Sequence, residues 1–229
     1  MRLLLLLLLS SYTTVLTAAP PIQFEQNRGQ TDSRVRYLAR YPQGTVFFTD
    51  REIVFSRGET KPVRFELLDS NTAAKWELSE PNGDQTSYMI GRDRSRWVDD
   101  VRHYARLGRR SVYPGIDAMW YGEEQRIEYD FLIAPGGDPR RIHIQIKGAR
   151  RVTINHEGEL VVASDRGEIR QHKPNIYQTA VDGSRSQVSG GFRLLGPNEA
   201  GFAVGVYDPS RPLIIDPVID FATYVGGEG

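Results

Sequence analysis

The stretch YPGIDAMWYGEEQRIEYDFLIAPGGDP, residues 113–139, decides the fold class of this chain. In RIEYDFLIA (126–134), polar and apolar residues alternate, which is the period of a strand with one buried side. DAMWYG (117–122) is a second short segment rich in residues that favour strands, and the three polar residues between the two segments suit a turn. We therefore predict a β-hairpin with its turn at residues 123–125.

The same period of two recurs along most of the sequence, and turn residues separate the segments. Clear examples are VRYLAR (35–40), TVFFT (45–49), EIVFS (52–56), VRFELL (63–68), AKWELS (74–79), ELVVAS (159–164), NIYQTAV (175–181) and VIDFATYV (218–225). Many short strands at this spacing indicate an all-β protein, and we expect a mostly antiparallel β-sandwich, with two packed β-lobes as a variant.

Helix is expected only as single turns. The candidates lie near residues 95–99 and 138–141, where Asp138 could cap a turn that has Pro139 at its first position. We treat residues 20–220 as one β-rich module. The charged stretch GRDRSRWVDD (91–100) is the place where a division into lobes would fall.

The N-terminus has the pattern of a secretory signal peptide. One arginine precedes seven leucines, and small residues follow up to Ala19. The leucine run is shorter than the roughly 20 apolar residues that span a bilayer, so we predict cleavage of residues 1–19 and no stable membrane span afterwards. The expected location is extracellular or at the cell surface, with the periplasm as an alternative.

Composition excludes several classes of protein. The sequence has no cysteine, so an exported chain would fold without disulfides and be stabilised by burial alone. Its formal net charge is zero, which gives no electrostatic basis for binding nucleic acid. The four histidines lack metal-site spacing, and no calcium loop, phosphate-binding loop or dinucleotide motif is present, so we expect neither metal nor cofactor.

Two carboxylates in the hairpin are candidates for chemistry. Glu128 and Asp130 are two residues apart in a strand and therefore point to the same face. Together with Asp117 they could serve as the acid and base of a glycoside hydrolase. The alternative, which we favour, is that they form the solvated outer face of the hairpin and pair with arginines on neighbouring strands.

Three further residues are candidates for ligand binding. Trp120 and Tyr121 could form a stacking platform for a sugar, but they lie on opposite faces of one strand, so at most one is in the core and one is exposed. We favour core or rim positions, because Tyr and Trp bury well in such cores. Arg28, in NRGQTD (27–32), could bind an anion. The structural alternative for that loop is a turn in which Gly29 has a positive φ and Asn27 bonds to the backbone.

A set of longer segments resembles one known family. The segments are FEQNRGQTDSRVRYLAR (24–40), SYMIGRDRSRWVDDVRHYARL (87–107), VYPGIDAMWYG (112–122), IEYDFLIAPGGDP (127–139), IRQHKPNIYQ (169–178) and VGVYDPSRPLIIDPVIDFATYVGG (204–227). Together they resemble the N-terminal module, a domain of unknown function, of bacterial cell-surface proteins that carry seven-bladed β-propeller (SBBP) repeats. FATYVGGEG (221–229) resembles the entry into those repeats, which this sequence does not contain.

This resemblance implies a location and an architecture, and it brings no catalytic residues. The expected function is an exported, non-enzymatic structural or recognition module whose partner is the propeller or another surface protein. We expect the final strand to offer an open edge for that docking. The alternatives are a non-catalytic module that binds glycan or cell wall, and a hydrolase that uses the paired carboxylates.

Overall fold

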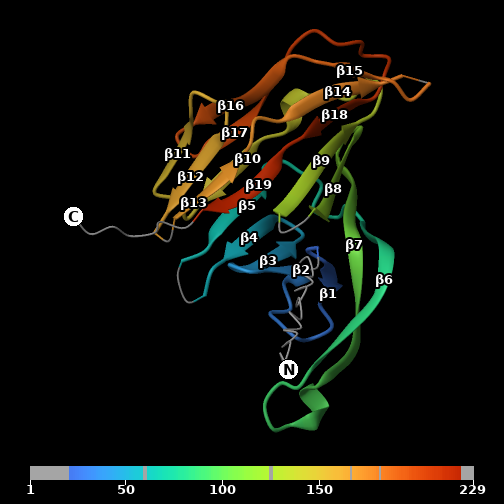
Figure 1. The fold of residues 1–229 in the computed structure, drawn as a ribbon, viewed down its shortest axis with the longest axis vertical. Helices are drawn as coiled ribbons and strands as arrows, with labels where there is room; N and C mark the ends of the chain where they lie inside the picture. The colour runs from blue at the N-terminus through green and yellow to red at the C-terminus, as the bar shows by residue number, and fades with distance from the viewer. Residues whose placement is uncertain (1–20, 59–60, 124–125, 166, 181, 223–229) are drawn as a thin grey trace, which may run out of the picture.

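The computed structural model describes residues 21–58, 61–123, 126–165, 167–180 and 182–222, so the predicted signal peptide and the last seven residues lie outside it. The described residues contain 19 strands and two short 3-10 helices (Figure 1). In chain order they are β1 (Phe24–Gln26), β2 (Val35–Tyr41), β3 (Gly44–Thr49), β4 (Glu52–Ser56), β5 (Val63–Leu67), β6 (Trp76–Tyr88), η1 (Arg94–Arg96), β7 (Val98–Tyr113), β8 (Ile116–Glu123), β9 (Arg126–Ile133), η2 (Pro139–Arg141), β10 (Ile144–Lys147), β11 (Arg151–Ile154), β12 (Leu160–Ser164), β13 (Gly167–Gln171), β14 (Asn175–Thr179), β15 (Arg185–Gln187), β16 (Gly190–Gly196), β17 (Glu199–Val204), β18 (Leu213–Asp216) and β19 (Val218–Ala222). The all-β prediction is confirmed.

The strands form one antiparallel sheet that curves until it is nearly closed into a barrel (Figure 1), so a sandwich is not confirmed. The sheet is branched, because β7 and β9 are long enough that one edge of each pairs with two different strands, one after the other. β7 pairs with β6 on one edge and with β8 and then β1 on the other. β9 pairs with β8 on one edge and with β18 and β19 on the other.

Two prolines lie where the sheet forks. Pro217 separates β18 from β19, and Pro174 lies just before β14, in the short break after β13. Proline cannot donate to a β-ladder, so each strand is interrupted there. Before Pro174, β13 pairs with β12 and β19. After it, β14 pairs with β15 and β18.

The predicted hairpin is confirmed as β8 and β9, whose register places Trp120 opposite Tyr129 and Tyr121 opposite Glu128. Two of the three residues expected in its turn, 124–125, lie outside the described residues. Both predicted helical turns are confirmed as η1 and η2. Asp138 caps η2 by accepting a hydrogen bond from the backbone N–H of Arg140 at 3.0 Å.

The strands β6 and β7 extend together as a long ribbon that projects from the rest of the molecule, at the bottom of Figure 1. Residues 91–100, considered as a division between lobes, lie at the tip of this ribbon. Residues 82–84 form an irregularity within β6, between the pairs at Pro81 and Gln85, and the long pairing with β7 continues on both sides of it.

A continuous apolar core fills the interior of the sheet, and aromatic residues dominate part of it. Trp120 packs with its ring centroid 5.5 Å from that of Phe48 and 5.7 Å from that of Trp76. The inward faces of β8 and β9 supply Ile127 and Phe131, which are almost fully buried. In a chain without cysteine, this burial is the main source of stability.

β19 pairs with β13 over residues 219–222 on one edge and with β9 only at Val218 and Ile219 on the other. Residues 223–225 of the predicted final strand lie outside the described residues, and its open docking edge stays a prediction. Among the described residues, no helix is long and apolar enough to cross a membrane.

Candidate functional site

Carboxylates gather on one side of β8, β9 and β18. Tyr121 on β8 lies opposite Glu128 on β9. On the other edge of β9, Ile215 of β18 pairs with Phe131, and the same register places the next residue of β18, Asp216, beside Asp130. Side chains at these cross-strand positions point to the same face of the sheet. We call the surface formed by Tyr121, Glu123, Glu128, Asp130 and Asp216 the acidic face.

The carboxylates of the acidic face are less solvated than predicted. Glu128 is only 6% exposed, and Asp130 and Asp216 are half-buried. The expectation of ion pairs with arginines is also wrong here. Within the described part of the chain, no arginine or lysine lies within 4.0 Å of a carboxylate oxygen of these three residues.

This environment shifts their protonation. Burial raises the pKa of Glu128 to about 7, and the charges of Glu123 and Asp216 add to the effect. Burial and the charge of Asp216 raise the pKa of Asp130 to about 6. Burial also raises the pKa of Asp216. Near neutral pH the acidic face therefore holds carboxyls that exchange protons readily.

Aromatic rings border these carboxyls. The hydroxyl of Tyr121 donates a hydrogen bond to Asp130 at 3.3 Å. The guanidinium of Arg106 lies 5.1 Å from the ring centroid of Tyr121, and Arg185 lies 4.5 Å from that of Tyr177 on β14. One face of each ring is therefore covered by a cation, and the hydroxyl and carboxyl groups remain the main binding atoms.

The other candidates predicted from the sequence lie elsewhere. Trp120 is 3% exposed and belongs to the core. Asp117 is held by Arg110 at 3.2 Å and by the backbone N–H of Ser111 at 2.7 Å. The structure thus brings Tyr121, Glu128 and Asp130 together and leaves Trp120 and Asp117 apart from them.

Arg28 takes part in a contact between loops. Its Nη1 atom donates to the backbone carbonyls of Asp99 and Asp100 at 2.9 and 3.2 Å, which ties the loop to the start of β7. The predicted loop geometry is confirmed. Gly29 has a φ of 115°, and the side-chain oxygen of Asn27 accepts a hydrogen bond from its backbone N–H at 3.0 Å.

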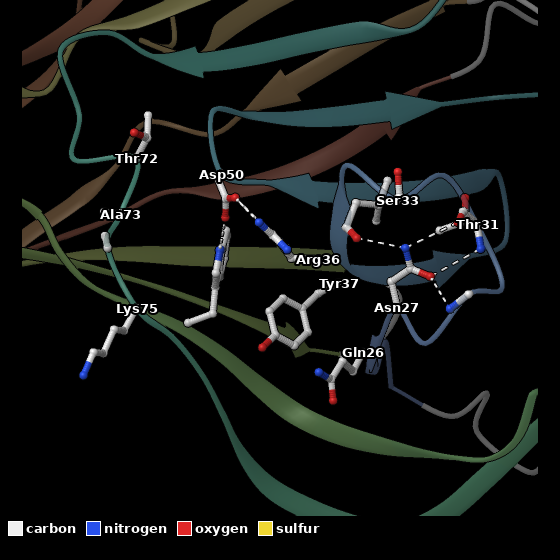
Figure 2. A pocket seen from close by; sticks show the side chains of 14 residues that line it. Gln26, Asn27, Thr31, Ser33, Arg36, Tyr37, Asp50, Thr72, Ala73 and Lys75 are labelled. Carbon is white, nitrogen blue, oxygen red and sulfur yellow. Dashed lines mark hydrogen bonds and ion pairs between the residues drawn. The ribbon is translucent and has the colours of Figure 1, made fainter.

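An open pocket of about 730 Å³ lies beside this loop, away from the acidic face (Figure 2). It is formed where the β1–β2 connection, the β3–β4 turn and the segment leading into β6 meet. Tyr37 and Trp76 provide its aromatic surface, with ring centroids 5.5 Å apart. Asp50 bridges Arg36, at 2.7 Å, and the indole nitrogen of Trp76, at 3.1 Å.

A third polar cluster lies next to the fork in the sheet. The two ring nitrogens of His172 face Glu159 at 2.6 Å and Asp220 at 2.5 Å. When both carboxyls are ionised they can only accept hydrogen bonds, so both ring nitrogens of His172 then donate and the ring is an imidazolium. We call these three residues the His172 clamp. The hydrogen bond to Asp220 is the largest cause of the raised pKa of His172, and Glu159 contributes as well.

Sequence reasoning missed Asp216 and the pocket. Asp216 ends the apolar segment LIID (213–216), and its neighbours along the chain do not reveal that β18 lies beside β9. Tyr37, Asp50 and Trp76 are likewise far apart in sequence. Among the described residues, no group of three or more acidic or histidine side chains could hold a metal ion.

The fold and these surfaces define an all-β module with several polar surfaces. The chain belongs to the family described as Domain of unknown function (DUF7948), which matches residues 24–218. No curated protein and no solved structure matches the chain.

Proposed function

We propose that this chain is an exported, non-enzymatic recognition module of a bacterial surface protein, which normally precedes a β-propeller. Its binding surface is the acidic face and its ligand is a polysaccharide. One observation carries this proposal: Glu128, Asp130 and Asp216 are partly desolvated beside one another, and burial raises their pKa values although Arg126, Arg106 and Arg185 lie near enough to oppose the shift. This arrangement costs stability, and a ligand rich in hydroxyl donors would offset that cost.

The location of the carboxyls supports binding more than catalysis. They lie on a face of the sheet whose borders, at Glu123 and Asn175, are exposed to solvent. The pocket in Figure 2 is lined by other residues, and Asp50 is the only carboxylate among them. Tyr121 supplies a hydroxyl and a ring edge beside Asp130, which suits a sugar chain lying along the strands.

A glycoside hydrolase is the second candidate, and the pKa values favour it. A carboxyl with a pKa of about 7, such as Glu128, can donate a proton near neutral pH, while a neighbouring carboxylate acts as base or nucleophile. In this case Asp130 or Asp216 would fill the second role.

A single experiment separates the two candidates. The purified protein is incubated with a panel of cell-wall and plant polysaccharides, and both retained protein and released reducing ends are measured. Retention without release, weakened in a Glu128→Gln/Asp130→Asn variant, is the expected result. Released reducing ends that disappear in this variant would establish the hydrolase instead. Absence of both would rule out polysaccharide as the ligand.

A further inference from the structure

The pocket in Figure 2 has features of a ligand site that are independent of the acidic face. Its walls are held in place before any ligand arrives. The side chain of Asn27 donates to the backbone carbonyls of Asp32 and Val35 at 2.8 and 2.9 Å, which fixes the loop on one side. The Arg36–Asp50–Trp76 chain of contacts fixes the other side. Such preorganisation reduces the entropy lost on binding.

Two of the charged side chains that line this pocket, Asp50 and Arg36, are paired with each other, and the exposed Lys75 also lines it. Burial opposes the ionisation of Asp50, but the hydrogen bonds from Arg36 and Trp76 outweigh it and lower its pKa. Asp50 therefore stays ionised and paired with Arg36 across the usual pH range. A ligand does not need a net charge to complement this pair.

Several uncharged donors and acceptors remain available. The Tyr37 hydroxyl and the side chains of Gln26 and Thr72 make no hydrogen bond or ion pair within the described part of the chain. Figure 2 shows the side chain of Gln26 close to the Tyr37 ring. The pocket thus combines a half-buried aromatic ring with unpaired amide and hydroxyl groups.

We propose that this pocket binds an uncharged hexopyranose unit of a glycan. A pyranose ring presents C–H groups on one face, which pack on an aromatic ring, and hydroxyls at its rim, which bond to amide and hydroxyl groups. Tyr37 provides the ring contact, and Gln26, its cross-strand partner, bonds to the hydroxyls of the same sugar unit. Thr72, which Figure 2 shows at the other end of the pocket, bonds to a hydroxyl of a neighbouring unit of the glycan. The inference shares the ligand class of the proposed function but assigns it to a different site.

The test is calorimetric titration of the purified protein with neutral tetrasaccharides of glucose, mannose and N-acetylglucosamine, with a tetramer of glucuronic acid for comparison. We expect at least one neutral tetrasaccharide to bind. Tyr37→Ala should weaken that binding about tenfold, in line with the loss of one aromatic stacking contact. Because this change also removes packing on Trp76, three milder variants, Tyr37→Phe, Gln26→Ala and Thr72→Ala, should each weaken binding about threefold or more, the loss of one hydrogen bond.

Tyr207→Ala is the matched control, since it removes a tyrosine that lines neither this pocket nor the acidic face and should leave this binding unchanged. Binding that persists unaltered in all four pocket variants would overturn the pocket assignment. If Tyr121→Ala or Glu128→Gln abolished binding instead, the proposed function would stand and the pocket would not. A wild-type protein that binds none of the neutral tetrasaccharides would overturn the inference, while retention on a polysaccharide could still support the acidic face.

Discussion

Asp216 and Asp220 are four residues apart on the run formed by β18 and β19, yet their surroundings differ. Asp220 accepts a hydrogen bond from the imidazolium of His172 at 2.5 Å. Asp216 lies beside Asp130, and burial raises its pKa. This difference shows that the alternation of side chains along a strand decides on which face of the sheet a carboxylate lies. The residues of the neighbouring strands decide whether its charge stabilises or destabilises the folded state.

Pro217 accounts for this difference. It interrupts the run, so Asp216 stays with β9 and β14, whereas Asp220 belongs to the part that pairs with β13. On that side His172, Arg170 and Arg126 supply positive charge, with Arg126 4.0 Å from Asp220 and Arg170 3.7 Å from Glu159. Asp220 is thus paired with cations, whereas around Asp216 burial and the charge of Glu123 outweigh the opposing effect of Arg185 and leave its pKa raised.

The largest expected effect comes from removing the cation of the His172 clamp. Because folding raises the pKa of His172, its stabilisation is complete below the unfolded-state value of 6.5 and is lost as the pH rises through the folded-state value. His172→Gln should therefore lower the free energy of unfolding by about 1–2 kcal/mol at pH 5, allowing for solvent screening of a partly exposed pair.

Chemical denaturation at pH 5 and pH 9 checks this, and the difference from wild type should shrink at pH 9. His156→Gln is the matched control, because His156 has an 89% exposed side chain and should change stability little at either pH. A loss of stability in His172→Gln that is equal at both pH values would show that the clamp is not a charge interaction.

Removing charge from the acidic face should change stability in the direction opposite to removing it from the His172 clamp, that is, it should raise the free energy of unfolding. Folding raises the pKa of Glu128 from 4.5 to about 7, so ionisation between these values destabilises the folded state. A Glu128→Gln/Asp130→Asn variant, which mimics the protonated carboxyls, should be more stable than wild type by about 1 kcal/mol at pH 8, after discounting for solvent screening. At pH 4 the difference should vanish.

Thermal unfolding at pH 4, pH 5 and pH 8 measures this change. Asp220→Asn is the comparison, because it removes a carboxylate that a cation already stabilises, and it should lower stability at pH 5. If both changes shifted stability in the same direction, the contrast between the acidic face and the His172 clamp would not hold.

The smallest expected effect comes from giving the acidic face a cation. Met119 on β8 lies opposite Asp130, so Met119→Lys places an ammonium group beside that carboxyl. It should lower the pKa of Asp130 and raise the free energy of unfolding by about 0.5 kcal/mol at pH 8, the usual size for a cross-strand ion pair.

Two further variants make this result interpretable. Met119→Leu reports the cost of losing methionine packing near Gly108, and Met89→Lys adds the same charge at a position that is 70% exposed on the projecting ribbon. Stability at pH 8 is measured by urea denaturation for all three. If Met119→Lys were less stable than Met119→Leu, burial rather than a missing cation would be the main influence on Asp130.

The sequence alone determined the local structure. The alternation in RIEYDFLIA and the polar residues before it specified the β8–β9 hairpin, because side chains in a strand alternate between faces. The turn at Gly29, with its positive φ, and the cap of η2 by Asp138 were also predictable, since each depends on residues only a few positions apart.

Only the tertiary structure decided which strands become neighbours. Alternation placed Glu128 and Asp130 on one face, but it could not show that β18 brings Asp216 beside them or that His172 meets Asp220 across β13 and β19. It also could not show that Trp120 joins the core while Tyr37 and Trp76 line a pocket. The physical reason is that burial and electrostatic environment depend on contacts between strands far apart in sequence, and these contacts set the pKa of each carboxyl.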